Sequence, residues 1–522
     1  MTAASDLQSS DGGKDDYAMR SYFGRINYDY AGKYLFEANV RMDGSSRFAP
    51  GNRWGTFPSF SAAWRITEES FMDNTRNWLD NLKLRVSYGS VGNNGGTDVG
   101  EYEYMSTYAS AKYPLGGKLV SGLASTSIAN SMLSWETSKM VNVGVDLNVL
   151  NNRLSFTADV FHKKTTGILF TPSIYLTAGN KTAPRQNIAE MSTKGVELTL
   201  GWNDKAGEVN YSVSGNFSYT PNKIDKYKGV FQAGYDENGN WKSNIGDVAS
   251  SSSAVDPIIE GNMKKEFYLR SPYKGSGKGY DVDGVAGGPA DGMIRTELDM
   301  AWLKAMIAEG YTFMPNKTVD KSKIWYGDYI YADVNGDGIY GGTDDREFQN
   351  VSADPKFNFG FQMSAAWRGF DISMNWAGAA GFKLYWGPTF GHNSLAANVG
   401  YSLGKDVADN RYFYNPDDPS DPRTNINSKY GRLVTTASGN QNAEGTSLYL
   451  YNANYLKLKN LTFGYTVPVS VSKKVFIENL RVYISIENVF NITKYPGQDP
   501  ELGATPQYTS LRQFAFGANI SF

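Results

Sequence analysis

Apolar and polar residues alternate along much of the chain with a period of two. In residues 22–30, Tyr22, Ile26 and Tyr30 occupy positions of one parity and Arg25 and Asn27 those of the other; the alternation resumes over residues 34–42 after a short link. Successive side chains of a β-strand point to opposite faces, so this pattern predicts a hairpin of two long strands with one apolar face.

The same alternation recurs in further segments that turn-forming residues separate. They are residues 56–66, 82–89, 139–149, 153–163, 193–202, 208–219, 355–367, 370–377, 455–466, 479–490 and 512–522. Alternating segments of about ten residues are typical of outer-membrane β-barrels, whereas the strands of a soluble β-sandwich are about half as long. We therefore predict an all-β fold over residues 1–522, an antiparallel transmembrane barrel with roughly fourteen to sixteen strands.

Aromatic residues stand at many of the predicted strand ends, among them Tyr22, Trp54, Trp64, Trp367 and Phe370. In an outer-membrane barrel, such residues form girdles at the two membrane interfaces. The alternative is that they are ordinary strand-end aromatics of a soluble sheet.

The connections alternate between short and long, as expected if short turns face the periplasm and long loops face the exterior. The longest, residues 221–354, is predicted to be an ordered extracellular excursion or a lid. Within it, residues 296–310 are predicted to form one short helix that ends at Gly310. We expect no second soluble domain.

Composition narrows the classes of function. The 51 basic and 53 acidic residues are interspersed, so no basic surface suits nucleic acid. The lack of cysteine excludes disulfides, thiolate metal sites and a cysteine nucleophile. No apolar run approaches the roughly 18 to 20 residues of a membrane-spanning helix, so any crossing must use strands. The first residues do not resemble a signal peptide, so the chain is expected to be mature or to lack its beginning.

Several short segments occur in a characteristic order from residue 21 to residue 501. They are SYFGRINY (21–28), DGSSRF (43–48), FPSFSAAWR (57–65), WETSK (135–139), YLKLKNLTFGY (455–465), NLRVY (479–483), ENVF (487–490) and YPGQDPE (495–501). Together they resemble the SusC/RagA-like TonB-dependent outer-membrane transporters of Bacteroidetes. The resemblance covers nearly the whole chain, which would be the C-terminal barrel portion of such a protein.

This resemblance implies a barrel of about 22 strands, an N-terminal plug domain, a TonB-contacting segment and a SusD-like surface lipoprotein as partner. The plug, the TonB-contacting segment and the earliest strands have no counterpart in this sequence, so TonB would act through that missing N-terminal part. The implied function is import of oligosaccharides or peptides across the cell outer membrane. Outer-membrane lipid would surround the barrel.

Residues 333–344 follow the spacing of a calcium-binding loop. Asp333, Asn335 and Asp337 offer side-chain oxygens at positions 1, 3 and 5, the backbone carbonyl of Ile339 stands at position 7, and Asp344 stands at position 12. The last carboxylate is shorter than the usual Glu and no helices flank the loop, so weak binding of a structural Ca²⁺ is expected. The alternative is a turn without an ion. No cofactor is required.

Candidates for catalysis are few. The chain has two histidines, His162 and His392, and neither a zinc-hydrolase nor a serine-hydrolase motif. Carboxylate pairs such as Glu68 and Glu69 suit glycoside hydrolysis only at a defined separation, and acidic loop pairs are ordinarily solvated. The sequence therefore predicts that the chain is not an enzyme.

Substrate contacts are expected from loop aromatics, because sugar rings stack on aromatic faces. The candidates are Trp241, Tyr280, Trp325, Tyr326, Tyr385, Trp386 and Tyr412. Two functions stay open: active import with a lipoprotein lid, and a self-contained passive pore or surface-binding barrel. The N-terminus of the native protein discriminates between them.

Overall fold

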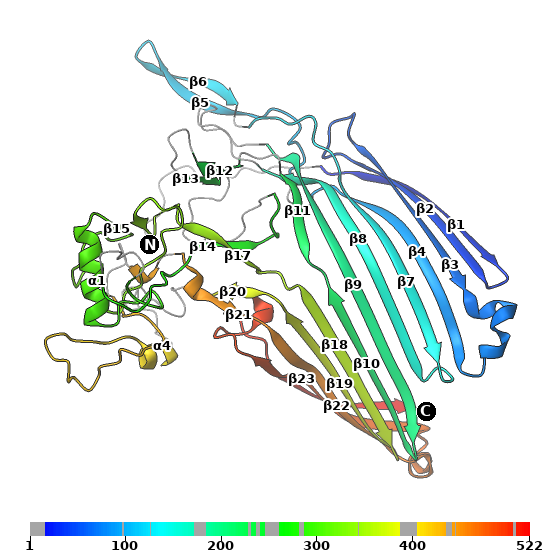
Figure 1. The fold of residues 1–522 in the computed structure, drawn as a ribbon. Coiled ribbons are helices and arrows are strands. Elements are labelled where there is room, and N and C mark those ends of the chain that lie inside the picture. Colours follow the sequence, from blue (N-terminus) through cyan, green and yellow to red (C-terminus); the bar gives the residue numbers. More distant parts are fainter. Residues whose placement is uncertain are drawn as a thin grey trace, which may run out of the picture.

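The computed structural model contains one large curved β-sheet with a folded insertion beyond one end of its strands (Figure 1). Backbone alone is described at residues 231–235, 241–245 and 443. The described residues are 16–96, 99–125, 127–171, 184–227, 231–235, 241–245, 260–280, 287–342, 344–386, 405–434, 441–443, 445–504 and 508–522.

The large sheet has fourteen strands. All but β11 follow one antiparallel path, and most strands that are neighbours in it also follow one another in the sequence. The path runs through β1 (Met19–Tyr30), β2 (Tyr34–Ser45), β3 (Trp54–Arg65), β4 (Leu79–Asn93), β7 (Glu136–Val149), β8 (Leu154–Phe170), β9 (Gln186–Ala206), β10 (Val209–Tyr219), β18 (Phe357–Trp367), β19 (Phe370–Ala380), β22 (Tyr455–Thr466), β23 (Asn479–Thr493) and β24 (Gln513–Ser521). Every predicted segment overlaps one of these strands. The predicted partial antiparallel barrel is therefore confirmed.

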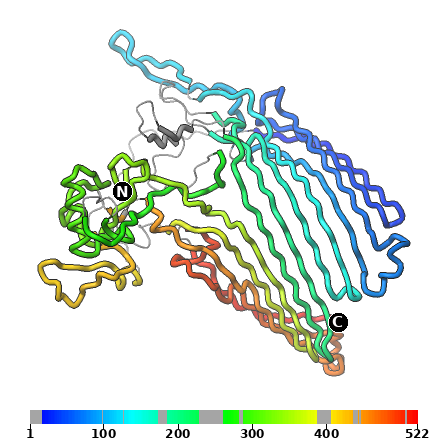
Figure 2. Tube along the Cα trace, in the orientation of Figure 1, coloured from blue at the N-terminus to red at the C-terminus, as the bar shows by residue number. Residues whose placement is uncertain are grey.

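Figure 2 shows the long strands lying side by side along their length. The strand β11 (Asn222–Tyr227) pairs with β9 just beyond β10. Among the described residues, β1 and β24 each pair on one side only, so the sheet is open. No helix in the described part of the chain is long and apolar enough to cross a membrane.

Connections at one end of the sheet are short. The links after β1, β7 and β18 are tight turns that use left-handed backbone at Ala31 (φ 53°), Asn151 (φ 58°) and Arg368 (φ 46°). Two links carry short helical turns, η1 (Ile66–Glu68) with η2 (Ser70–Thr75), and α5 (Val469–Ser472) with η8 (Lys473–Val475).

Connections at the opposite end are long and hold the remaining elements. They are β5 (Tyr108–Leu115), β6 (Lys118–Ser125), β12 (Phe231–Tyr235), β13 (Trp241–Ile245), β14 (Glu266–Arg270), α1 (Glu297–Ala308), β15 (Thr312–Phe313), β16 (Ile339–Tyr340), β17 (Arg346–Ser352), β20 (Lys383–Tyr385), α4 (Lys405–Asn410), η6 (Gln441–Ala443), η7 (Ser447–Tyr449), β21 (Leu450–Asn452) and η9 (Pro500–Leu502). The alternation of short and long connections is thus present. The predicted helix 296–310 corresponds to α1.

The two faces of the sheet differ as a membrane barrel requires. On one face, the strand-end aromatics Tyr22, Trp54, Trp367 and Phe370 are more than 40% exposed, as are many apolar residues between them. Soluble proteins rarely expose so much contiguous apolar surface, so this face suits lipid. The other face is polar; there Arg85 of β4 binds carboxylates on both β7 and β8. We call it the inward face.

Candidate functional site

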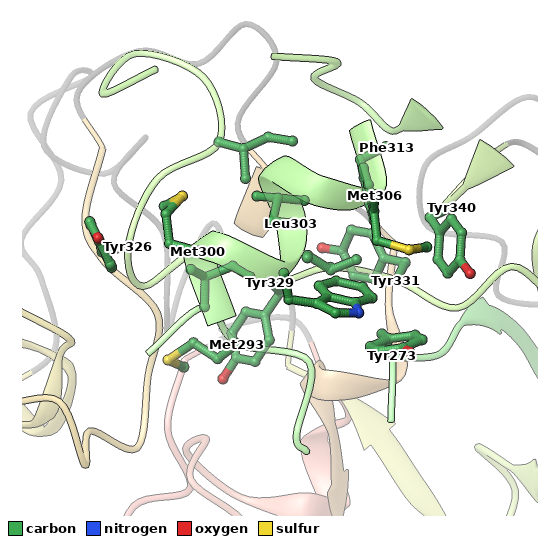
Figure 3. Packing of buried hydrophobic residues seen from close by; sticks show 14 of the residues in the cluster. Tyr273, Met293, Met300, Leu303, Met306, Phe313, Tyr326, Tyr329, Tyr331 and Tyr340 are labelled. Atoms are coloured by element: carbon green, nitrogen blue, oxygen red, sulfur yellow. The ribbon is translucent and has the colours of Figure 1, made fainter. Parts of the chain in front are cut away.

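Parts of two long connections, those between β10 and β18 and between β19 and β22, fold into a unit with its own hydrophobic core. We call it the loop module, and it comprises the described residues of 260–356 and 405–449. In Figure 1 it lies to the left, beyond the ends of β18 and β19. Its core surrounds α1, where Trp302 is fully buried and stacks on Tyr273 at 5.1 Å between ring centroids. Figure 3 shows Met300, Leu303 and Met306 of the same helix directed into this core. The module is thus a packed body rather than a loose loop.

Local sequence explains the start of α1. The side chain of Thr296 accepts a hydrogen bond from the backbone N–H of Asp299, and the Asp299 carboxylate accepts one from the backbone N–H of Thr296. This reciprocal capping box satisfies backbone donors that the first helical turn leaves free. The helix therefore begins where the sequence predicts.

A buried ion pair joins the two halves of the loop module. Arg432 donates from Nε to Oδ1 of Asp328 at 2.8 Å and from an Nη to Oδ2 at 2.7 Å, and Asp328 is completely buried. Arg432 also donates to the carbonyls of Lys321 and Lys323, and Asn442 donates to Asp328. Burial raises the pKa of Asp328, and the hydrogen bonds and charge of Arg432 oppose that rise.

A second set of polar contacts joins the same two halves. Gln441 donates to the carbonyl of Met314 at 2.8 Å and accepts from Asn316, while Tyr331 donates to the carbonyl of Gln441. Since Gln441 and Asn442 belong to the chain between β19 and β22, and their partners to the chain between β10 and β18, both long connections are needed to complete the module.

The structure places most of the predicted substrate aromatics inside this packing. Tyr412 is 2% exposed and donates to the carbonyl of Arg295, and Tyr326 is 8% exposed. Tyr280 and Trp325 are partly buried against the same core. Their side chains thus contribute to the module, and a contact with substrate stays a prediction.

The other candidates lie between the module and the sheet, or outside the described side chains. Trp386 is 9% exposed and meets Tyr495 edge-on at 5.9 Å, and Tyr385 of β20 meets Tyr449. The backbone of Trp241 begins β13, but its side chain lies outside the described residues. His392 lies outside them as well. Substrate roles for Trp241, Tyr385 and Trp386 therefore stay predictions.

In the predicted calcium loop, side-chain oxygens accept hydrogen bonds from backbone N–H groups of the same loop. Asp333 accepts from the N–H groups of Gly336 and Gly338 at 2.7 and 2.9 Å, and Asp337 accepts from that of Ile339 at 2.8 Å. Asn335 accepts from the N–H of Asp337 at 3.1 Å. Thr343 lies outside the described residues. In the part of the chain that is described, no group of three His, Cys, Asp or Glu could hold a metal.

Asp345, next to the predicted ligand Asp344, is the carboxylate that closes this loop on itself. It is 1% exposed and accepts from the N–H groups of Val334 and Gly342, each at 2.7 Å. Burial raises its pKa, and these hydrogen bonds oppose the rise. The sequence prediction did not include Asp345, because position 12 of the calcium-loop spacing falls on Asp344. Calcium binding stays a prediction.

A buried lysine ties the last long connection to the sheet. Lys457 of β22 donates to Asp499 at 2.7 Å and to Glu501 at 2.8 Å. Burial tends to raise the pKa of both carboxyl groups, but the hydrogen bonds and charge of Lys457 outweigh it, so both pKa values lie below their usual range.

Comparison with known proteins matches this architecture. The family model described as "TonB dependent receptor-like, beta-barrel" matches residues 2–296. The chain is 27% identical over 518 residues to TonB-dependent receptor P3 of Formosa agariphila, covering 96% of this chain and 45% of that protein. It is also 27% identical to TonB-dependent receptor SusC of Bacteroides thetaiotaomicron, covering 96% of this chain and 43% of that protein.

Among solved structures, the RagAB peptide transporter superposes with a TM-score of 0.68 at 23% identity, covering 97% of this chain and 48% of that one. At this identity, the likeness concerns the fold. The chain spans about half the length of the curated relatives that it matches.

Proposed function

This chain belongs to the TonB-dependent receptor-like β-barrel family, and on that premise we propose that it forms part of an importer of oligosaccharides or peptides. It is an outer-membrane protein and not an enzyme, as the sequence predicted. The observation that carries the proposal is the large antiparallel sheet, with exposed aromatics on one face and ion pairs on the other. Such a wall separates lipid from a polar conduit.

The open edges of the sheet support completion by further strands. A strand edge in lipid leaves backbone N–H and C=O groups without partners, at a cost of several kcal/mol each. We propose that β1 and β24 pair with strands outside this sequence, and that a plug and a TonB-contacting segment belong to the same protein.

We propose that the long connections face the exterior and meet a SusD-like surface lipoprotein. The packed core of the loop module supports this, because a rigid surface loses less conformational entropy on binding than a mobile loop. Affinity purification of the native protein from outer membranes is expected to recover a lipoprotein. Recovery of the barrel alone under mild detergent would contradict this partner.

Deletion of the gene tests the function. Cells without the protein are expected to lose uptake of at least one labelled oligosaccharide or peptide, and the intact gene is expected to restore it. Uptake that is equal with and without the gene for every oligosaccharide and peptide tested would contradict the proposal.

The second candidate, a self-contained passive pore, has its own discriminating measurement. The native protein is extracted from outer membranes, and its intact mass is expected to exceed the 57.6 kDa of this chain. Its N-terminal peptides are expected to include sequence upstream of Met1. A mass near 57.6 kDa would favour the passive pore instead.

A further inference from the structure

Lysines gather on the lipid-facing side of the sheet, which we call the outward face, where β7, β8 and β9 approach the long connections. Cross-strand partners share a face, and His162 of β8 pairs with the exposed Val141 of β7 and with Lys194 of β9. The next row toward the long connections crosses β7, β8, β9 and β11 and holds Lys139, Lys164, Ser192 and Lys223. We call Lys139, Lys164, Lys194 and Lys223 the outer lysine cluster.

On the side of this cluster toward the short turns, the outward positions of β7, β8 and β9 are apolar. Three successive rows hold Val143, Val160 and Val196, then Val145, Ala158 and Leu198, then Leu147, Phe156 and Leu200. From Val149 to Val141, β7 covers about 27 Å, and a strand tilt of about 40° makes this about 20 Å along the membrane normal. The apolar band of an outer-membrane barrel is about 25 Å tall. The cluster therefore lies where the acyl chains end and the lipid headgroups begin.

Cations outnumber anions in this part of the outward face. Lys164 forms an ion pair with Glu190 at 3.0 Å, and Asp225 accepts a hydrogen bond from Ser192 at 2.8 Å. Lys226 stands opposite Glu190 in the strand register. Lys226 and the four lysines of the cluster thus share two carboxylates, so the surface favours an anion.

Three lysines of the cluster can bind an anion from outside the protein. Lys139, Lys194 and Lys223 are exposed, and within the described part of the chain no ion pair or hydrogen bond engages their side chains. A groove of about 530 Å³ runs through the cluster, and the residues that line it include His162, Lys164, Lys194 and Lys223.

Completion of the barrel would leave this surface open. β7, β8 and β9 each pair with a strand on both sides, whereas further strands would join the sheet at β1 and β24. A plug fills the interior of a barrel, which is the side of the inward face. The exposure of the cluster therefore does not depend on the part of the protein outside this sequence.

We propose that the outer lysine cluster binds the phosphate groups of a phosphorylated lipid in the outer leaflet of the outer membrane. The continuous apolar band favours a lipid over an acidic protein, because one lipid can place its acyl chains on the valines and its headgroup among the lysines. A lysine is costly at the centre of a bilayer but not at its interface, and phosphate gives its charge a partner. The inference goes beyond import and needs only that the long connections face the exterior.

Removal of the three unpaired charges tests the site. The full-length native protein is purified in detergent, freed of lipid and titrated with lipid A that carries two phosphates. EDTA is present, so divalent cations cannot bridge the phosphates to Glu190 or Asp225. The triple variant Lys139→Gln, Lys194→Gln and Lys223→Gln is expected to raise Kd about tenfold or more, because each lysine near an anionic lipid contributes to binding.

The matched control removes three exposed lysines at the short-turn end of the sheet, by Lys205→Gln, Lys473→Gln and Lys474→Gln. A higher Kd in the triple variant but not in this control supports the proposal. The same Kd in the native protein and both variants overturns it. Equal affinity of the native protein for lipid A without its phosphates also overturns it, because the acyl chains alone would then account for binding.

Acetylation of lysines provides an independent readout. A water-soluble acetylating reagent is expected to modify Lys194 more slowly in isolated outer membranes than in the delipidated protein, and added lipid A is expected to restore the protection. Protection that only a co-purifying protein restores would assign the cluster to an acidic partner and overturn the proposal. Neither experiment measures uptake, so failure of this proposal leaves the proposed import function unaffected.

Discussion

The ion pair between Asp328 and Arg432 is expected to hold the loop module together. In Arg432→Met, the fully buried Asp328 loses its cation and the carbonyls of Lys321 and Lys323 lose a donor. Breaking a buried pair from one side costs about 3 to 5 kcal/mol. The population of the opened module should therefore rise on the order of a hundredfold to a few thousandfold.

Amide hydrogen exchange of α1 measures this opening, because the buried face of the helix depends on the module core. In the native protein in detergent, exchange of residues 297–308 is expected to accelerate by that factor in Arg432→Met. The matched control is Lys405→Met, which removes an exposed ion pair with Asp409 and should change stability by less than about 1 kcal/mol. Equal exchange rates of α1 in the two variants would refute the claim that the buried ion pair between Asp328 and Arg432 stabilises the loop module.

Three further predictions concern other parts of the loops. Calcium is expected to protect residues 320–350 from protease and EDTA to remove that protection; identical cleavage in both would exclude a bound ion. The pKa values of Asp499 and Glu501 are lowered, so their contribution to stability is present above about pH 4 and is lost as the pH falls through the lowered values. Cleavage of residues 494–512 should increase over that pH range, and a Lys457→Met protein should show the increase already at neutral pH. Thr296→Ala should destabilise α1 by about 0.5 to 2 kcal/mol, as hydrogen exchange of its first turn will test; unchanged exchange would contradict the capping role.

The long strands could be located from sequence because each is two-sided, with lipid on one face and polar groups on the other. Residues 141–149, where apolar and polar residues alternate strictly, fall wholly inside β7. The ends of the strands could be predicted less well than their centres. The predicted segment 82–89 is only the centre of β4 (Leu79–Asn93), because alternation ends where the strand leaves the lipid.

The loop module was predicted only in part. The sequence indicated an excursion at residues 221–354 and its helix, but not that residues 405–449 complete the same core. Arg432 and Tyr412 carry no local signal of this, because contacts between distant segments have no periodicity. Composition likewise cannot separate a stacking platform from a packed core, so the buried residues Tyr326 and Tyr412 have the same sequence signal as an exposed substrate contact.

The arrangement of the inward face could likewise be predicted from the sequence only in part. The positions of β10, β18 and β19 that face inward follow from their parity, so Asn216, Gln362 and Asn375 could be assigned to one face from sequence. These three residues line one groove. That placement depends on the register between strands far apart in the sequence; Ser218 of β10 and Asn358 of β18, for example, pair although 140 residues separate them. That register is set by the whole sheet.

Energy dependence of uptake tests the central claim most directly. Cells that take up a labelled substrate through this protein are treated with an uncoupler that collapses the proton-motive force on which TonB depends, and accumulation is followed before and after. Active import predicts that accumulation stops while the protein stays in the outer membrane. Uptake that continues at the same initial rate would contradict active import and favour a passive pore.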